Sequence, residues 1–411
     1  MNVATAIATE MPGRSNSRLT QRARLKIWWR ELDHVLLGLI VLLMAVGCAA
    51  IAAASPAGAD RLSTDQVTLN PLHFLWLHLR FLVLGIAAML GLSMLSRESA
   101  RRFAILLSLG MVAALVLVPL IGTEVNGARR WLNLGFSFQP SEFLKPGFAI
   151  TLAWILSWKL KDPNMPVFGL VTAALALVVG LLMVQPNLGD AILFTGVWFV
   201  LVLLGGVSAR QIAALVAAGS GMLVLAYMFY GNARNRIDSF FSGGSDYDQV
   251  DLAQRTLLAG GWDGVGFWVG RAKMRLPEAQ TDYIFSVVGE EFGLIACAGI
   301  VLLFCAIVLR VLMRAASEEN FFALLAASGL IAQLGGQAFI NILVNLSLFP
   351  SKGMTLPLVS YGGSSTIAVC IAFGLLLALT RRNPFLTRET AGLRMSLFDK
   401  DRGLFDKDKD R

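Results

Sequence analysis

The sequence has little charge and few cysteines. Only 15% of its 411 residues are charged and 56% are hydrophobic, a balance too apolar for an ordinary soluble protein. Its four cysteines (Cys48, Cys297, Cys305 and Cys370) all lie inside apolar runs, without the spacing of a disulfide framework or a metal site. The net charge of +8 comes without a basic face interleaved with aromatic residues, so we expect no nucleic-acid partner. These absences favour an integral membrane protein.

Apolar residues fall in blocks of about 20, the length that crosses a hydrocarbon layer of about 30 Å. We expect ten membrane helices, at residues 35–54, 75–95, 103–122, 143–160, 166–184, 190–207, 211–231, 283–312, 321–348 and 364–381. Pro186 and Gly189 interrupt the 166–207 region. The predicted fold class is therefore all-α, a polytopic membrane domain over residues 35–382 with one large extracytoplasmic loop at about 231–282.

Basic residues in the short loops predict the orientation of the helices. If the spans alternate, these residues share one side of the membrane, and both termini are then cytoplasmic. They are Arg14, Arg18, Arg22, Arg24, Lys26, Arg30, Arg97, Arg101, Arg102, Lys159, Lys161, Arg210, Arg310, Arg314, Arg381 and Arg382. A cleaved signal peptide or a lipoprotein site at Cys48 is the rival interpretation of the first block, but the preceding basic region is too long for either.

Both ends of the chain are polar. Residues 1–34 form the predicted cytoplasmic N-terminal segment, and the stretch 22–33, with Trp28 and Trp29 beside basic residues, is typical of an amphipathic helix on the inner surface. Residues 383–411 form the predicted cytoplasmic tail, and its last part, 396–411, alternates densely in charge and contains the sequence LFDKD twice. This pattern favours a disordered tail. Whether the tail binds a partner or is merely solvated stays open.

One acid stands out at a predicted membrane boundary. Asp282 lies in the segment 276–293, LPEAQTDYIFSVVGEEFG, where a long apolar helix begins. A carboxylate at such a boundary is expensive to keep and marks a functional site by default. Asp282 is therefore the first candidate for chemistry.

The large loop that precedes Asp282 is rich in cations. They are Arg234, Arg236, Arg255, Arg271, Lys273 and Arg275. They either stabilise an anionic group such as a pyrophosphate or contact lipid headgroups, and the sequence leaves both interpretations open. The glycine-rich run 260–266 in this loop lacks the preceding strand of a nucleotide-binding motif, so we expect a flexible turn.

A second outward loop, residues 126–145, carries charges at the start of a helix. Glu142 and Lys145 are three residues apart and share a helical face, so we expect them to pair with each other or with a third charge. A purely structural ion pair is the alternative. Arg129 and Arg130 suit an anion, and Trp131 suits either a sugar ring or an interfacial anchor.

Amides recur every four residues in the predicted ninth helix, at Gln333, Gln337, Asn341 and Asn345. They form one polar stripe, which serves either interhelical hydrogen bonding or the wall of a substrate groove. The following segment, 349–365, is interrupted by Gly and Pro. We expect it to be irregular and buried in protein at membrane depth.

The chain resembles the SEDS family of bacterial envelope proteins, the FtsW/RodA/SpoVE group. The resemblance covers roughly residues 35–382 and is carried by residues 126–131, 139–145, 185–189, 276–293 and 352–365. The sequence PSKGMTLP at 350–357 is most similar to the division-type FtsW branch. One departure concerns the usual QPDxG motif, which here has Asn187 in place of the acid and an acid, Asp190, three residues later.

The resemblance implies a peptidoglycan glycosyltransferase that polymerises lipid II during septal cell-wall synthesis. It assigns the catalytic role to Asp282, as the general base that deprotonates the 4-hydroxyl of the acceptor sugar, with undecaprenyl pyrophosphate as the leaving group. The substrate-binding candidates are Arg129, Arg130, Trp131, Glu142, Lys145, Arg271, Lys273, Glu278, Thr281, Lys352, Ser360 and Ser364. We expect no resident metal and no certain cofactor, and a divalent cation (Mg²⁺ or Mn²⁺) would arrive with the pyrophosphate.

The implied partners are lipid II, a class B penicillin-binding protein that supplies the transpeptidase, other divisome proteins and membrane lipids. The implied location is the bacterial inner membrane at the division site. Three rival functions stay open at this stage: a lipid II flippase, an elongation polymerase of the RodA type and a scaffold. Asp282 at the outer boundary favours chemistry over transport, because a flippase needs polar groups through the midplane and the inner half as well.

Overall fold

The structure is a computed structural model of the 411-residue chain. It describes residues 21–64, 67–125, 128–133, 135, 137–207, 209–229, 231, 234, 238, 249–350 and 353–382. Two units can be distinguished. One spans Asp33–Thr380 and contains the membrane helices, and the other combines the two ends, Met1–Leu32 and Arg381–Arg411. In the second unit, α1 (Gln21–Glu31) is the helix predicted for residues 22–33, and it contains Trp28 and Trp29.

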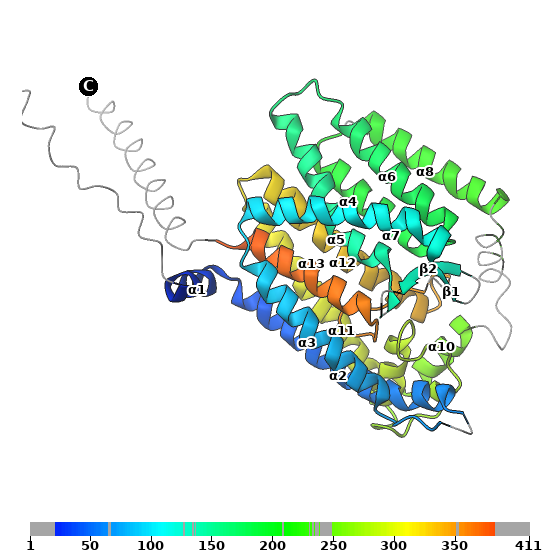
Figure 1. Ribbon diagram of the computed structural model, residues 1–411. Coiled ribbons are helices and arrows are strands. Elements are labelled where there is room, and N and C mark those ends of the chain that lie inside the picture. The colour runs from blue at the N-terminus through cyan, green and yellow to red at the C-terminus, as the bar shows by residue number, and fades with distance from the viewer. Residues whose placement is uncertain are drawn as a thin grey trace, which may run out of the picture. The chain divides into compact units, whose positions relative to one another are not determined.

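Every predicted apolar block contains a helix (Figure 1). The helices are α2 (His34–Leu62), α3 (His73–Ser93), α4 (Arg97–Ile121), α5 (Pro140–Ser157), α6 (Val167–Val184), α7 (Leu188–Leu204), α8 (Ala209–Phe229), α11 (Ile284–Ala316), α12 (Phe321–Asn345) and α13 (Ser364–Thr380). Within the described ranges, α2, α3, α4, α6, α11 and α12 are long and apolar enough to cross a membrane. The number of crossings stays a prediction.

The core of the larger unit lies around α5, α12 and α13. All residues of α13 except Ile367 are buried, and α5 buries both its apolar and its charged residues. α13 packs along α3 because small residues let the backbones approach. A side chain at Gly85 of α3 would collide with Cys370, and one at Gly374 of α13 would collide with the backbone of Met89.

Charged residues join several helices at one end of this unit, which we call the Asp33 end. Asp33 caps α2 by accepting from the backbone N–H groups of Val35 and Leu36, and its carboxylate binds Arg310 (2.9 Å) and Arg314 (2.8 Å) of α11. Burial raises the pKa of Asp33, but the hydrogen bond from Arg310 and the charge of Arg314 hold it below its ordinary value. Arg314 also donates to the carbonyl of Thr380, so α2, α11 and α13 meet here.

The long loop before Asp282 contains regular structure that the sequence analysis did not predict. It includes α10 (Gln249–Ala259) and a 3₁₀ turn, η3 (Ala272–Met274). Figure 1 places α10 at the same end of the bundle as the strands of the other outward loop. These strands, β1 (Thr123–Val125), β2 (Ala128–Asn133) and β3 (Ser137–Phe138), form an antiparallel sheet in the order β1-β2-β3 and add a small β element to the predicted all-α class.

The glycine-rich run 260–266 is packed into a break in α11, so the expectation of a flexible turn was wrong. Gly293 leaves the helical conformation (φ 82°, ψ 173°) and opens the backbone of α11. The loop fills this break: Val265 N–H donates to Glu290 O (2.9 Å), and Leu294 N–H donates to Gly261 O (3.0 Å). A side chain at Gly264 would collide with the carbonyl of Glu291. Gly264 and Gly293 are needed because two backbones come together here.

Candidate functional site

Asp282 lies where the sequence analysis placed it, at the start of a long apolar helix. α11 begins two residues later at Ile284, and Asp282 is half-buried. A tight turn precedes it, in which Glu278 has a left-handed backbone (φ 52°) and accepts at its carboxylate from the Thr281 hydroxyl (2.8 Å). Glu278 and Thr281 therefore shape the turn that presents Asp282, whatever further contact they make with a substrate.

The amide ladder of α12 holds the backbone on which Asp282 is carried. The side chains of Asn341 and Asn345 both donate to the carbonyl oxygen of Asp282, at 2.8 and 3.1 Å. Asn345 also accepts at its Oδ1 from the backbone N–H and the hydroxyl of Ser286, at 3.1 and 2.8 Å. Two amides therefore fix the peptide on both sides of the start of α11.

The same ladder holds the irregular segment that follows α12. Asn341 donates to Met354 O (2.6 Å), and Gln337 donates to Thr355 O (2.9 Å). Of the two roles that the sequence left open for the ladder, hydrogen bonding between elements is the one that Gln337, Asn341 and Asn345 perform. Met354 and residues 356–360 are buried, as predicted for this segment.

The segment brings a glycine next to the Asp282 carboxylate. A Cβ at Gly353, which has φ 62°, would lie 3.5 Å from Asp282 Oδ2. Lys352, the residue before it, lies outside the described residues, so its predicted contact with pyrophosphate stays a prediction. Its chain position places it one residue from the glycine that faces the acid.

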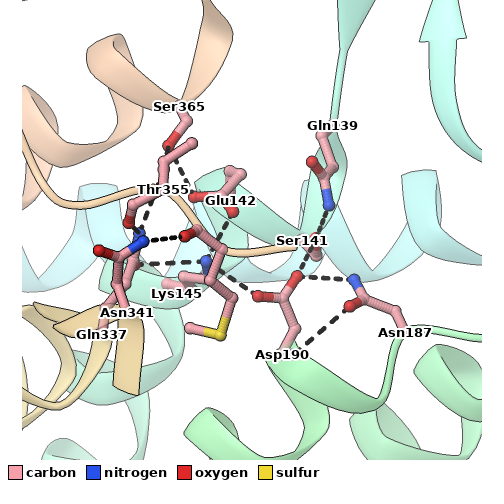
Figure 2. A network of polar contacts seen from close by, with 11 residues as sticks. Gln139, Ser141, Glu142, Lys145, Asn187, Asp190, Gln337, Asn341, Thr355 and Ser365 are labelled. Atoms are coloured by element: carbon pink, nitrogen blue, oxygen red, sulfur yellow. Dashed lines mark hydrogen bonds and ion pairs between the residues drawn. The ribbon is translucent and has the colours of Figure 1, made fainter. Parts of the chain in front are cut away.

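A buried ion cluster lies next to Gln337, a member of the same α12 ladder. Lys145 Nζ binds Glu142 Oε1 at 2.6 Å and Asp190 Oδ1 at 2.9 Å, and all three side chains are at least nine-tenths buried. Figure 2 shows the two carboxylates converging on the ammonium group. The expectation that Glu142 and Lys145 pair with each other or with a third charge is confirmed, and the third charge is Asp190.

Hydrogen-bond donors surround the two carboxylates of this cluster. Asp190 Oδ2 accepts from Ser141 Oγ and from Asn187 Nδ2, both at 2.7 Å, and Glu142 Oε2 accepts from Ser365 Oγ at 3.1 Å. Asn187 caps α7 and touches the acid three residues later, so the altered QPNLGD motif still brings a carboxylate to this place.

Gln337 connects the ion cluster with the Asp282 region. Its Oε1 lies 3.4 Å from Lys145 Nζ, while its Nε2 donates to Thr355. Figure 2 shows these groups as one chain of contacts from Asn187 and Asp190 to Asn341. Polar groups on α5, α7, α12 and the segment before α13 thus form a single network that ends at the backbone of Asp282.

The predicted cations of the shorter outward loop differ in their surroundings. Arg130 donates to the backbone carbonyls of Gln185 (3.2 Å) and Pro186, which ties β2 to the turn before α7. Arg129 is exposed and pairs with Glu124 at 3.3 Å, an ion pair of small energetic weight. Trp131 is half-buried on β2 beside both arginines. Arg129 is thus the more accessible of the two for an anionic ligand.

Lys273 is surrounded by contacts within the protein. It is buried, its ammonium group binds Glu291, and it also donates to the carbonyl of Ala53 (2.8 Å). Glu290 accepts from the backbone N–H groups of Ala272 (2.7 Å) and Lys273 (2.8 Å). This geometry favours a role for Lys273 in fixing η3 over the predicted contact with pyrophosphate. The sequence signal for this pairing is the Glu290-Glu291 doublet inside an apolar helix.

The remaining candidates are placed as follows. Arg271 is exposed at the start of η3, seven residues before Glu278 in the chain. Ser360 is buried and accepts at its hydroxyl from Leu356 N–H (2.9 Å), so it stabilises a turn. Ser364, at the start of α13, has a buried hydroxyl without a hydrogen-bond partner in the described structure. Among the described residues, no group of three or more His, Cys, Asp or Glu side chains is arranged to hold a metal ion.

Comparison with known proteins agrees with this architecture. The sequence model of the FtsW/RodA/SpoVE family, described as cell cycle protein, matches residues 33–384. The chain belongs to this family. It is therefore a multi-pass membrane protein with the SEDS fold, as the resemblance implied.

Curated relatives include the probable peptidoglycan glycosyltransferase FtsW of Caulobacter vibrioides, which is 36% identical over 89% of this chain and 93% of the relative. The protein of the same name from Aromatoleum aromaticum is 37% identical over 85% of this chain and 88% of the relative.

Two solved structures are also similar. One is a chain of a peptidoglycan synthase complex studied for its coordination of polymerization and crosslinking, with 29% identity, a TM-score of 0.70, and coverage of 85% of this chain and 97% of that chain. The other is the rod shape determining protein RodA of Thermus thermophilus, with 28% identity, a TM-score of 0.63, and coverage of 86% of this chain and 97% of that chain.

Proposed function

We propose that this protein is a peptidoglycan glycosyltransferase that polymerises lipid II into glycan strands during septal synthesis. The names of the curated relatives support the reaction class, and their FtsW designation supports the division role over the elongation role. The observation that carries the proposal is a half-buried carboxylate, Asp282, on a backbone fixed by Asn341 and Asn345.

In this proposal Asp282 is the general base. The 4-hydroxyl of the acceptor's GlcNAc attacks C1 of the donor's MurNAc, and Asp282 takes the hydroxyl proton as the new bond forms. The bond between C1 and the pyrophosphate oxygen breaks, and undecaprenyl pyrophosphate leaves with the electron pair. Attack opposite an α-linked leaving group inverts C1 and gives a β-linkage, so no second carboxylate is needed as a nucleophile.

Cations near Asp282 would stabilise the negative charge that develops on the leaving group. Arg271 and Arg129 are the exposed candidates in the described structure, and Lys352 is the candidate from sequence. A divalent cation that arrives with the pyrophosphate would supply the same stabilisation. The ion cluster around Lys145 is buried, so its proposed role is to position the segment beside Asp282.

The proposal extends to location and partners. The protein would lie in the bacterial inner membrane with both termini in the cytoplasm, and the Asp282 end would face the periplasm. A class B penicillin-binding protein would supply the transpeptidase. The similar chain in a peptidoglycan synthase complex supports this pairing.

A polymerisation assay separates this function from the flippase and scaffold alternatives. The purified full-length protein is mixed in detergent with fluorescent lipid II, alone and with a class B penicillin-binding protein, and the products are separated by gel electrophoresis. We expect a ladder of glycan polymers that muramidase digests. A flippase would leave lipid II unpolymerised but would transfer it between the leaflets of proteoliposomes, and a scaffold would do neither.

A further inference from the structure

A cleft of about 350 Å³ opens at the Asp33 end of the bundle, away from Asp282. It lies between the start of α4, the end of α5 and the start of α12. The residues that line it are Arg97, Glu98, Arg101, Trp154, Ser157, Leu160, Lys161, Asn320, Phe321 and Phe322. An ion pair between Arg97 and Glu318 (2.9 Å) joins α4 to the residues after α11 and places the cleft at this end.

The polar part of the cleft carries more positive than negative charge. Arg97, Arg101 and Lys161 face a single lining carboxylate, Glu98. Glu98 binds Arg101 at 2.6 Å. Lys161 is exposed and makes no side-chain hydrogen bond or ion pair within the described part of the chain. Arg97 is already paired with Glu318, so phosphate oxygens would serve Lys161 and the part of Arg101 that Glu98 does not bind.

Arg101 has unused hydrogen-bonding capacity. Its Nε is buried and has no hydrogen-bond partner in the described structure, although its Nη2 binds Glu98. The guanidinium carbon lies 5.6 Å from the centre of the Trp154 ring, so the aromatic face orients the group. A buried donor without a partner is unfavourable, and an anionic oxygen in the cleft would satisfy it.

The rim of the cleft is apolar. Leu160 is 70% exposed, and Phe321 and Phe322 are half-buried beside it. α4 and α12 also begin here, at the caps Ser96 and Asn320, so two helix N-termini add partial positive charge. Cations next to exposed apolar side chains at the end of a helix bundle match a phospholipid, whose phosphate lies beside its acyl chains.

We propose that this cleft binds the phosphate of an anionic phospholipid headgroup, with Arg101 and Lys161 as the phosphate ligands and Leu160 against the acyl chain. The site is separate from the proposed glycosyltransferase site. If the Asp33 end faces the cytoplasm, as the basic loops predict, the lipid comes from the inner leaflet.

Native mass spectrometry of the purified full-length protein tests the proposal. The protein is titrated in detergent with dioleoyl phosphatidylglycerol and, separately, with dioleoyl phosphatidylcholine. Sodium phosphate is then added as a competitor of bound phosphatidylglycerol. Arg101→Gln should weaken the tightest phosphatidylglycerol site about five-fold, and adding Lys161→Gln should weaken it about 25-fold in total. Arg102→Gln is the matched control: Arg102 also pairs with Glu98 (3.1 Å) but does not line the cleft, and the affinity should stay unchanged.

Three results would overturn the proposal. The first is equal phosphatidylglycerol affinity of the Arg101→Gln and Arg102→Gln proteins, and the second is equal affinity of the unmodified protein for the two lipids. The third is displacement of phosphatidylglycerol by phosphate at the same concentration, which would indicate a site for the free anion. Thermal unfolding of each variant controls for folding. If Arg101→Gln unfolds, Lys161→Gln alone decides, because Lys161 is exposed and its change should weaken lipid binding about five-fold.

Discussion

At the scale of single residues, the position of Asp282 depends on two buried side chains of α12. Asn341 and Asn345 donate to its carbonyl oxygen from α12, and both side chains are buried. Misplacement of a catalytic group by a fraction of an ångström is enough to slow a reaction. The ladder is therefore a positioning element for the proposed base.

Replacing Asn345 separates positioning from binding. Asn345→Leu removes the contacts with Asp282 and Ser286, and we expect kcat to fall about ten-fold while KM for lipid II stays within about two-fold. The matched control is Gln333→Leu, three turns along the same stripe, since Gln333 makes no hydrogen bond to Asp282 in the described structure. Steady-state polymerisation kinetics provide the measurement, and equal effects of the two changes would contradict the positioning role.

The ion cluster predicts a large effect on stability. Lys145→Met would leave Glu142 and Asp190 buried without their cation, and we expect a loss of about 3–5 kcal/mol in the free energy of unfolding. Lys159→Met, just after α5, removes a lysine that donates to the carbonyls of Gly205 and Gly206 and lies 4.5 Å from the centre of the Phe168 ring, and we expect a loss of about 1 kcal/mol. Unfolding in detergent compares the two, and a small loss for Lys145→Met would show that the carboxylates are protonated or solvated.

At the scale of elements, α11 shows what apolar patterning predicts and what it does not. The sequence predicts a long helix near 283–312, and the structure has one at Ile284–Ala316. Its break at Gly293 and the insertion of residues 260–266 were not predicted, because they depend on two glycine-containing segments meeting from different parts of the chain. Periodicity reports local structure, whereas such a packing contact is non-local.

Substitutions in the glycine-rich run test this insertion. Gly264→Ala combines a positive φ (83°) with a collision against Glu291, and we expect a loss of about 2–4 kcal/mol in unfolding free energy. Gly261→Ala is the matched control, with a positive φ (59°) but open space around the new Cβ, and we expect about 1 kcal/mol. Thermal unfolding distinguishes the two, and equal losses would indicate that the loop is not packed into α11.

The candidate site could be predicted from the sequence only in part. The motifs identified Asp282, and the spacing of Glu142 and Lys145 predicted that they pair. The sequence could not show that Lys273 forms an ion pair with Glu291, or that Asn345 donates to the carbonyl of Asp282. Those contacts join residues far apart in the chain, and a cation in a loop has the same sequence pattern whether it binds a ligand or a buried acid.

At the scale of the whole molecule, the fold places Asp282 and the Asp33 cluster at opposite ends of the bundle. The Asp33 end gathers Arg310, Arg314, Arg97 and the start of α2, and the Asp282 end lies at the opposite ends of α11 and α12. Basic residues favour the cytoplasmic side. The proposed base would then face the periplasm, where the disaccharide of lipid II is exposed.

Cysteine labelling tests this orientation. Asp263→Cys, in the loop before α11, and Asp162→Cys, after α5, both replace exposed acids. In intact spheroplasts, we expect a membrane-impermeant maleimide to modify Asp263→Cys but not Asp162→Cys, and both after lysis. The unmodified chain is the control for its own cysteines. The reverse pattern would place Asp282 on the cytoplasmic side and contradict the account.

The central claim is that the Asp282 carboxylate takes the proton of the attacking hydroxyl, and the most direct test is polymerisation of fluorescent lipid II by Asp282→Asn. The control is Asp263→Asn, which removes an exposed acid from the loop before α11. With both proteins folded, we expect the rate to fall about 10²–10⁴-fold in Asp282→Asn and to stay unchanged in Asp263→Asn. An Asp282→Asn protein that polymerises lipid II at the unmodified rate would contradict the account.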